Sequence, residues 1–396
     1  MEWKEVTLGE IAIFKTGKLN SNAATSNGEY PFFTCSPETL RINNYAFDQE
    51  AILLAGNNAD GNFSIKYYKG KFNAYQRTYV ITPIRGKVDI KFLYYALSLC
   101  LKQFKSMSRG TSTKFLTVTI LNSFSVQLPS ISDQRRIATI LSSLDRKIEL
   151  NNQINADLEE MAQAIFKNWF VDFEPFKDGK FVESELGMIP EGWKVSQIID
   201  IPHILETGRR PKGGAVEEGI PSVGAEHVKG MCSYDYSKTK YINAEFASKL
   251  KSGKIKGYEL LIYKDGGKPG YFIPNFSIFG EGYPFEECYL NEHVFKLDFN
   301  DNKGFNIFCY FFFKTKAIMK YLNAQGAKAA IPGINKKDIE YIYILSPNND
   351  AVRDFGIFAL PLFKKILQNA NENLRLSHLR DTLLPKLMSG ELEVSE

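Results

Sequence analysis

Two segments of the chain carry apolar residues at alternating steps of four and three positions. The first runs from Ser132 to about Phe170, and the second runs from about residue 349 to the end of the chain. This heptad spacing predicts two long helices, each packed along another long helix. We expect the first helix to begin near Ser132, with Asp133 adding a favourable charge at its N-terminus. Pro361 is expected to kink the second helix or to delay its start.

Four asparagines lie within the apolar series of these two helices. The predicted partner-docking and helix-packing positions are Leu141, Leu144, Ile148, Asn151, Asn155, Leu158, Leu362, Ile366, Asn369, Asn373 and Leu376. A buried asparagine in such a seam costs stability but fixes register and direction. The other interpretation is that the four amides lie at the edge of the seam and are solvated. The pattern leaves both interpretations open.

The rest of the chain, 1–130 and about 188–348, alternates short strand-like apolar runs with turns. Turn signals such as Asn27-Gly28 and Asp60-Gly61 separate the runs. Each segment holds one apolar run that is compatible with a helix, Phe92 to Leu101 and Phe305 to Ala317. The pattern predicts two α+β units that consist mostly of strands.

The strand-rich segments and the predicted helices form a unit that occurs twice. Pro347 follows Pro129 by 218 positions, and this offset carries Asn151 and Asn155 onto Asn369 and Asn373 without a gap. Weaker matches pair Trp3 with Trp193, Lys15-Thr16-Gly17 with Glu206-Thr207-Gly208, Ala51–Gly56 with Leu260–Gly266, Tyr75–Val80 with Leu290–Phe295, and Arg109–Lys114 with Gln325–Lys328. So many matches in one order indicate a duplication.

The duplication predicts the fold class: α+β, with two pseudo-twofold-related globular domains separated by two long antiparallel coiled-coil helices. Helices that are related by a twofold axis and pack on each other must run in opposite directions. The expected segments are a first globular domain at 1–130, a central long helix at 131–175, a linker at 176–192, a second globular domain at 193–348 and a C-terminal long helix at 349–396. The extra length of the second domain is expected between residues 225 and 290.

Composition narrows the classes of function. The formal net charge of +4 argues against a strongly basic binder but permits a local DNA-binding face. Five cysteines without a CxxC spacing are expected to be reduced, buried thiols of a cytoplasmic protein, and four scattered histidines predict no metal site. The first ten residues do not resemble a signal peptide, and the apolar run Phe305–Phe313 is too short to span a membrane.

Basic and polar loops recur at matching places in both globular segments. Arg209 to Lys212 is the densest basic loop, and by itself such a loop is usually only a solvated surface turn. Its counterpart, Lys15 to Lys18, is also basic, which favours DNA contact. Arg77 is expected within an apolar strand, so it is either a DNA contact or a structural ion-pair partner. The candidate DNA-binding residues are Lys15, Lys18, Asn57, Asn58, Arg77, Arg109, Thr111, Ser112, Lys114, Arg209, Arg210, Lys212, Lys264, Lys268 and Lys328.

Two other classes of function compete with DNA recognition. A methyltransferase would need a glycine-rich cofactor loop and an Asn/Asp-Pro-Pro-aromatic motif, and neither is present in the sequence. A nuclease would need clustered carboxylates with a lysine, and Asp89-Ile90-Lys91 is the only fragment of that kind. We therefore expect no catalytic residue and no cofactor. A paired-domain protein scaffold without DNA binding would explain the helices but not the recurring basic loops.

Three phrases resemble the specificity subunits of Type I restriction–modification systems. Glu185-Leu186-Gly187 to Ile189-Pro190-Glu191-Gly192-Trp193 resembles the start of their second target-recognition domain. Asp133-Gln134-Arg135-Arg136-Ile137 resembles the start of their central helix, and Leu379–Leu392 resembles their closing segment. The residues Val352 to Leu360 depart from the pattern of the first helix.

This resemblance implies a non-catalytic DNA-recognition subunit. Each globular domain would read one half of a bipartite site in double-stranded DNA, and the helices would set the spacer between the halves. The helices would also dock two methyltransferase subunits, and restriction subunits (nuclease/translocase) would complete the complex. The departure at Val352 to Leu360 makes the second docking surface less certain than the first.

Overall fold

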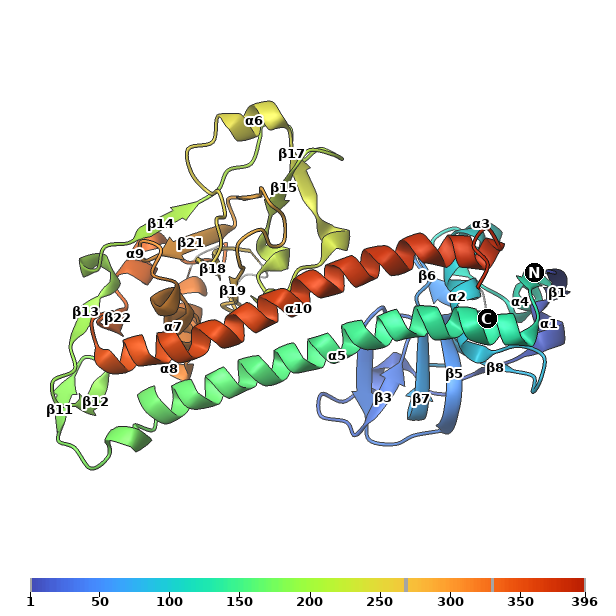
Figure 1. Ribbon diagram of the computed structural model, residues 1–396, viewed down its shortest axis with the longest axis horizontal. Coiled ribbons are helices and arrows are strands. Elements are labelled where there is room, and N and C mark those ends of the chain that lie inside the picture. Colours follow the sequence, from blue (N-terminus) through green and yellow to red (C-terminus); the bar gives the residue numbers. More distant parts are fainter. Residues whose placement is uncertain (1, 267–269, 329–330, 395–396) are drawn as a thin grey trace. The chain divides into compact units, whose positions relative to one another are not determined.

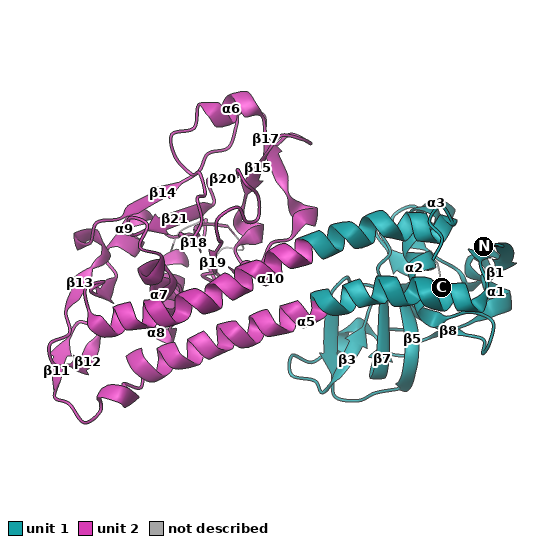
Figure 2. Cartoon of the chain, viewed as in Figure 1, with its two compact units in different colours: residues 1–148, 375–396 teal, residues 149–374 magenta. Residues whose placement is uncertain are grey.

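The computed structural model (Figure 1) describes residues 2–266, 270–328 and 331–394. The chain divides into two compact units (Figure 2): unit 1 comprises 1–148 with 375–396, and unit 2 comprises 149–374. Each unit combines helices with sheets, which confirms the mixed α and β class that the sequence predicts. Two forty-residue helices, α5 (Ile131–Phe170) and α10 (Asp350–Ser389), each contribute to both units.

Unit 1 is built on a six-stranded sheet in the order β2-β8-β5-β7-β3-β4. Its strands are β2 (Ala12–Thr16), β3 (Tyr30–Phe33), β4 (Thr39–Ile42), β5 (Phe47–Ala55), β7 (Ile65–Ala74) and β8 (Thr78–Pro83). The run Ala51–Ala55 in the middle strand is buried, as an apolar strand with neighbours on both sides should be. Two small pairs complete the unit: β1 (Lys4–Thr7) with β10 (Ser125–Leu128), and β6 (Asn57–Asn58) with β9 (Lys114–Phe115).

Unit 1 has two helices where the sequence predicts one. The expected helix Phe92–Leu101 is α2 (Ile90–Leu99), and α3 (Leu101–Met107) follows it directly. Asp89, the residue of the nuclease-like fragment, caps α2, because its carboxylate accepts the backbone N–H groups of Lys91 and Phe92. It therefore lies at a helix N-terminus. The short helices α1 (Leu8–Ile11) and α4 (Val118–Ser123) complete the unit.

Unit 2 has a five-stranded sheet, β14-β21-β18-β19-β16, and a three-stranded sheet, β17-β15-β20. The strands are β14 (Ile204–Thr207), β15 (Ile220–Val223), β16 (Gly230–Met231), β17 (Lys240–Ile242), β18 (Leu260–Tyr263), β19 (Phe276–Ile278), β20 (Tyr289–Leu290) and β21 (Val294–Asp298). A separate pair joins β13 (Val195–Gln197) to β22 (Tyr343–Leu345). The segment expected as a linker forms a hairpin of β11 (Phe181–Ser184) and β12 (Gly187–Pro190).

The expected helix Phe305–Ala317 of unit 2 is also two helices. They are α7 (Lys303–Phe313) and α8 (Lys316–Gly326). Every residue of α7 from Phe305 to Phe313 is buried, so this helix lies in the middle of its core rather than on the surface. The helices α6 (Ala244–Ser248) and α9 (Lys336–Glu340) complete the unit.

The two units share their order of strands. In unit 1, β2 pairs with β8 and β8 with β5, and in unit 2, β14 pairs with β21 and β21 with β18, all antiparallel. A parallel pair occurs at the same place in each, β3 with β7 and β15 with β20. The interval between β15 and β18 is longer than that between β3 and β5 and contains β16, β17 and α6. Most of the extra length therefore lies within the range that the sequence predicts.

The start of α5 differs from the predicted one. The helix begins at Ile131, and Ser130, not Ser132, provides the cap, because its hydroxyl oxygen accepts the backbone N–H of Asp133 at 3.2 Å. The hydroxyl of Ser130 also donates to the carboxylate of Asp133 at 2.7 Å. The reciprocal bonds resemble a capping box and explain why the helix begins immediately after Ser130.

Pro361 does not delay the start of α10, which excludes one of the two predicted effects. The helix begins at Asp350, eleven residues earlier, and Asn349 accepts the backbone N–H of Val352 at 3.3 Å. A proline inside a helix leaves the carbonyl four residues before it without its usual donor. That carbonyl belongs to Ile357, which is 71% exposed, so water can satisfy it.

The cysteines are less uniformly buried than the sequence predicts. Cys232, Cys288 and Cys309 are buried in unit 2, whereas Cys35 and Cys100 of unit 1 are half-buried. All five are free thiols, as expected. Among the described residues, no helix combines the length and the apolar character that crossing a membrane requires.

Candidate nucleic-acid interface

A junction of three chain segments positions the candidate residues of unit 1. The backbone N–H of Gly56, at the end of β5, donates to the carbonyl of Arg77, just before β8, at 2.8 Å. The carbonyl of Gly56 accepts the N–H of Leu116, just after β9, at 2.9 Å. Gly17, after β2, lies so close to the carbonyl of Ala74 that a Cβ atom would collide with it.

The same junction occurs in unit 2 with different residues. The N–H of Lys264 donates to the carbonyl of His293 at 2.9 Å, and the carbonyl of Lys264 accepts the N–H of Ile334 at 2.8 Å. Gly208 lies against the carbonyl of Leu290 as Gly17 lies against that of Ala74. These bonds make Lys264 the counterpart of Gly56 and His293 the counterpart of Arg77.

The junction corrects two of the sequence matches. Gly266 was expected to correspond to Gly56, but the hydrogen bonds assign that place to Lys264. The match of Tyr75–Val80 with Leu290–Phe295 is displaced by one residue, since Arg77 corresponds to His293 and Tyr75 therefore to Asn291. Both errors arise because a short apolar run can slide along its counterpart, whereas backbone hydrogen bonds fix one register.

In unit 1 the junction brings several candidates together around Phe115. The guanidinium of Arg77 lies 5.1 Å from the centre of the Phe115 ring, and Arg77 forms no ion pair within the described residues. A structural ion pair, the alternative role of Arg77, therefore has no support there. Asn57 and Asn58 pair with Phe115 and Lys114 along β6 and β9, and the backbone of Arg109 also pairs with Phe115.

One buried acceptor of unit 1 has no partner. Within the described residues, the side-chain oxygen of Asn57 is buried and accepts no hydrogen bond. Asn58 is engaged locally, because its side-chain oxygen accepts the N–H groups of Asp60 and Asn62 at 2.9 and 3.0 Å. A buried polar atom without a hydrogen-bond partner destabilises the folded protein. The side-chain oxygen of Asn57 can therefore accept a hydrogen bond from a ligand.

In unit 2 the junction carries a network of charged side chains. Arg210 contacts Glu292 at 2.9 Å and the Nε2 atom of His293 at 3.3 Å. The Nδ1 atom of His293 contacts Asp265, and the ammonium of Lys264 lies 3.2 Å from Asp265. Two predicted residues, Arg210 and Lys264, are therefore brought together, with two carboxylates between them.

The sequence did not single out Asp265, Glu292 and His293 as site residues. A partial signal existed, since the sequence match pairs Arg77 with Glu292 and Asp265 follows the strand that matches β5, but only the backbone hydrogen bonds assign His293 to the place of Arg77. Acidic side chains are not expected at a DNA-contacting surface, because the phosphates favour positive charge. Phe115, the platform for Arg77, was missed for the same reason.

The side chains of the other candidates take no part in the contacts of Arg77, Arg210 and Lys264. Exposed residues of this group are Lys15, Lys18, Arg109, Thr111, Ser112, Arg209, Lys212 and Lys328. Lys114 is half-buried beside Asn58. Lys328 donates to the side chain of Gln325 at 2.8 Å. Lys268 lies outside the described residues.

A carboxylate holds the strand that precedes the loop Arg209 to Lys212 in unit 2. Glu206 in β14 accepts the ammonium of buried Lys296 at 2.8 Å and the N–H of Gly253 at 2.9 Å. Burial raises the pKa of Glu206, but the bonds from Lys296 and Gly253 outweigh burial and leave the pKa below its usual value. Glu206 is therefore ionised at neutral pH and fixes the strand that leads into Arg209 and Arg210.

The seam asparagines of unit 2 form two matching hydrogen bonds. The amide of Asn151 donates to Asn373 at 2.9 Å, and the amide of Asn369 donates to Asn155 at 2.8 Å. The two bonds are equivalent in the repeat, because Asn369 lies 218 positions after Asn151 and Asn373 lies 218 positions after Asn155. Asn151 and Asn369 are 0% and 1% exposed. Asn151 and Asn369 are therefore not solvated, whereas Asn155 and Asn373 are half-buried. Within unit 2 the two helices run in opposite directions.

The other residues predicted to pack between the helices differ in how far they are buried. Leu141 and Ile366 are buried, whereas Leu144, Ile148, Leu158, Leu362 and Leu376 are half-buried. Phe363 and Ala370, which the heptad pattern did not include, are buried in the core of unit 2. A helix that packs on a globular core as well as on another helix needs a wider apolar face than a two-helix seam does.

The chemistry of the described residues is that of binding. No group of three or more histidine, cysteine or acidic side chains within the described chain has the arrangement of a metal site. The charged network at Arg210 instead offers both donors and acceptors on adjacent loops. Such groups recognise the edges of bases and the phosphates of nucleic acid.

Comparison with known proteins identifies the class. Residues 1–160 match the family profile of the Type I restriction modification DNA specificity domain. The chain is 30% identical to the EcoDI specificity subunit of Escherichia coli over 99% of this chain and 89% of that protein. It is 33% identical to the MjaIX specificity subunit of Methanocaldococcus jannaschii over 80% of this chain and 72% of that protein.

A solved structure shares the fold. The S subunit of a Type I restriction–modification system from M. genitalium aligns with a TM-score of 0.59 and 18% identity, over 98% of this chain and 96% of that one. The chain belongs to the family of Type I restriction enzyme specificity subunits. It is a DNA-recognition subunit, the component of these systems that carries no catalytic activity.

Proposed function

We propose that each globular part of this specificity subunit reads one half of a bipartite site in double-stranded DNA. The support is that one junction, with the same backbone hydrogen bonds, occurs in both units and carries polar and charged side chains in each. Two similar readers with different side chains would recognise two different short sequences. The globular domains are those expected at 1–130 and 193–348.

The two junctions supply different chemistry for reading bases. In unit 1, Asn57 and Arg77 offer an amide and a guanidinium, groups that match adenine and guanine in the major groove. In unit 2, Arg210, Glu292 and Asp265 combine a guanidinium with carboxylates, which accept from the amino group of cytosine. The two half-sites should therefore differ in sequence.

Exposed basic residues around the junctions would contact phosphates and set the position of the protein on DNA. Lys15, Lys18, Arg209 and Lys212 are exposed and form no ion pair within the described residues. An arginine or lysine without a protein partner can neutralise a phosphate without first breaking a bond. These residues should add affinity and salt dependence but little sequence preference.

The long helices would act as a spacer and as a docking surface. Each helix has forty residues, which corresponds to about 60 Å at 1.5 Å per residue. The matching asparagine bonds favour an antiparallel coiled coil with a pseudo-twofold axis. The helices would dock two methyltransferase subunits, and restriction subunits would complete a complex that acts in the cytoplasm.

Methylation mapping in cells tests the bipartite site. The gene is expressed with its neighbouring methyltransferase gene, and methylated adenines are located across the genome. We expect a split motif, with two short defined halves around a fixed number of unspecified bases. No motif, or a continuous one, would contradict the proposal and favour a protein scaffold.

Single substitutions assign each half to one junction. Arg210→Ala should relax or change one half of the motif and leave the other half intact, and Arg77→Ala should affect the opposite half. Arg85→Ala, which removes an exposed arginine from the turn after β8, is the control and should change neither half. Loss of both halves in Arg210→Ala with an unchanged melting temperature would contradict the assignment of one reader to each unit.

A further inference from the structure

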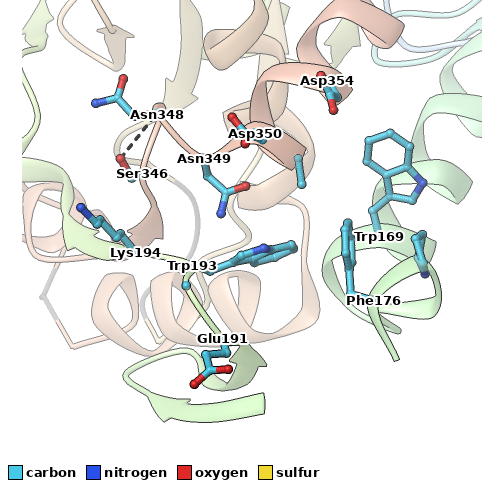
Figure 3. Close-up of a pocket in the computed structure, with 13 residues that line it drawn as sticks. Trp169, Phe176, Glu191, Trp193, Lys194, Ser346, Asn348, Asn349, Asp350 and Asp354 are labelled. Atoms are coloured by element: carbon cyan, nitrogen blue, oxygen red, sulfur yellow. Dashed lines mark hydrogen bonds between the residues drawn. The ribbon is translucent and has the colours of Figure 1, made fainter. Parts of the chain in front are cut away.

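A pocket of about 590 Å³ lies at the start of α10 in unit 2 (Figure 3). Three aromatic side chains line it: Trp169 near the end of α5, Phe176 just after that helix, and Trp193 before β13. The first residues of α10 close another side, including Asp350 and Asp354. In Figure 3, Trp193 lies across from Phe176 and Trp169. The proposed DNA interface uses none of these residues.

The aromatic walls are held in place by other rings. Trp193 packs edge-on against Phe176 with 5.0 Å between the ring centres, and against Phe173 at 5.8 Å. Trp169 packs edge-on against Phe355 of α10 at 6.5 Å. All three wall residues are nevertheless half-buried, so part of each ring remains accessible. Rings fixed in this way can receive a ligand with little loss of side-chain entropy.

The charges around the pocket are mainly negative. Its charged lining residues are three carboxylates, Glu191, Asp350 and Asp354, and one ammonium, that of Lys194. Asp350 pairs with Arg353, whereas Glu191 and Asp354 form no ion pair within the described residues. An aromatic pocket with unpaired carboxylates suits a cation, because both the ring faces and the carboxylates attract positive charge.

The equivalent place in unit 1 is covered by the chain itself. Trp3 corresponds to Trp193, because Lys4 pairs with Leu128 as Lys194 pairs with Ser346, and these partners are 218 positions apart. The segment after α10 passes over Trp3, so that a Cβ atom at Gly390 would lie 2.5 Å from the Nε1 atom of the indole. In unit 2, the segment after α5 instead leads into the hairpin β11–β12 and leaves the pocket beside Trp193 open.

We infer that this pocket receives the side chain of an arginine presented by a protein partner. A guanidinium is planar, stacks on tryptophan and forms paired hydrogen bonds with carboxylates, so it satisfies both features of the lining. Trp169 and Trp193 would sandwich or flank the guanidinium, and Glu191 and Asp354 would accept its hydrogen bonds. The inference rests on the proposed docking of methyltransferase subunits, since they are the partners assigned to this helix.

The test compares charge-neutral variants in the complex. Glu191→Gln combined with Asp354→Asn keeps the shape of the pocket and removes its unpaired charges. We expect the double variant to bind the methyltransferase subunit about tenfold more weakly than the wild type, with an unchanged melting temperature. Glu245→Gln, at another exposed carboxylate in the first turn of a helix, is the matched control and should bind normally. Equal binding by the double variant and the wild type would overturn the inference.

A direct titration separates this inference from the proposed docking function. If the wild type binds no methyltransferase subunit, the docking function fails, and the pocket is then judged by its own ligand. N-acetyl-argininamide should quench tryptophan fluorescence of the wild-type chain saturably, whereas the neutral isostere N-acetyl-citrullinamide should not. The double variant should lose the response. Equal responses to both compounds, or no saturable response, would overturn the inference.

Discussion

Buried charges in unit 2 show how single residues support the candidate interface. Lys296 is 6% exposed, and its ammonium lies 2.8 Å from Glu206, 3.9 Å from Glu259 and 2.7 Å from the carbonyl of Lys254. The two carboxylates respond differently to this shared partner. Bonds to Lys296 and Gly253 lower the pKa of Glu206, whereas burial raises the pKa of Glu259.

Glu206→Gln should destabilise the protein in a pH-dependent way. A carboxyl group whose folded pKa is lowered stabilises the folded state above its unfolded pKa, near 4.5, and loses this contribution as the pH falls through the folded pKa. We expect the variant to lose about 2 kcal/mol of unfolding free energy at pH 7, and we expect this loss to become smaller below pH 4.5. Urea unfolding at several pH values measures the difference between the variant and the wild type.

Glu259→Gln should change the stability of the protein with the opposite pH dependence to Glu206→Gln. Because the folded pKa of Glu259 is raised, its contribution is present below the unfolded pKa and is lost as the pH rises. The stability of this variant relative to the wild type should therefore increase between pH 4 and pH 7. Two variants with the same pH dependence would show that the charges are not placed as described.

At the scale of elements, the long helices are specified by polar contacts as much as by apolar ones. Asn151 donates to both Glu372 and Asn373, at 2.8 and 2.9 Å, from a fully buried position. Asn369 repeats the second of these bonds by donating to Asn155 at 2.8 Å. Shifting one helix along the other would leave these amides buried without partners, so they select a single register.

Asn151→Ala should cost about 1–3 kcal/mol of unfolding free energy, because it removes two hydrogen bonds from a buried site. Asn369→Ala should cost a similar amount, since the repeat places it equivalently. Asn152→Ala, at an exposed neighbour that accepts one bond from Asn373, is the control and should cost less than about 1 kcal/mol. Denaturant titration compares the three, and equal losses from Asn151→Ala and Asn152→Ala would contradict the register role.

Substitutions at Leu141 and Leu144 should distinguish an effect on folding stability from an effect on binding of the methyltransferase subunit. Leu141 is fully buried in the core of unit 1, so Leu141→Ala should cost about 2–5 kcal/mol. Leu144 is half-buried, so Leu144→Asp should leave the melting temperature nearly unchanged and weaken binding of the methyltransferase subunit. Calorimetry and pull-down of the subunit are the measurements. Normal docking by a stably folded Leu144→Asp variant would exclude this face as a docking surface.

At the scale of the molecule, the proposed arrangement of two DNA-reading domains and a helical spacer predicts how the length of the helices sets the recognised site. Removing four residues from each helix, at paired positions, shortens each by about 6 Å. Since successive base pairs are about 3.4 Å apart, the spacer of the methylated motif should shorten by about two base pairs while both halves stay the same. Methylation mapping of the shortened variant measures this. An unchanged spacer would show that the helices do not set it.

The sequence alone determined the duplication, the two long helices, the mixed fold class and the family. These follow from periodic or repeated patterns, which persist because each repeat of the pattern is under the same packing constraint. The offset of 218 positions identified Asn151 and Asn155 as the equivalents of Asn369 and Asn373, but it did not show which of the four form hydrogen bonds. The family resemblance rested on phrases spread along the chain, and the comparison over 99% of its length confirms it.

Only the tertiary structure decided which residues meet. The carboxylates of Asp265 and Glu292 contact His293 and Arg210 because backbone hydrogen bonds join strands that are distant in sequence, and no local pattern encodes that register. The pocket at Trp169 and Trp193 likewise forms where the end of one helix meets the beginning of another. Pro361 lies within α10, and Ile357, whose carbonyl it leaves without its usual donor, is an exposed residue; exposure depends on the folded chain as a whole.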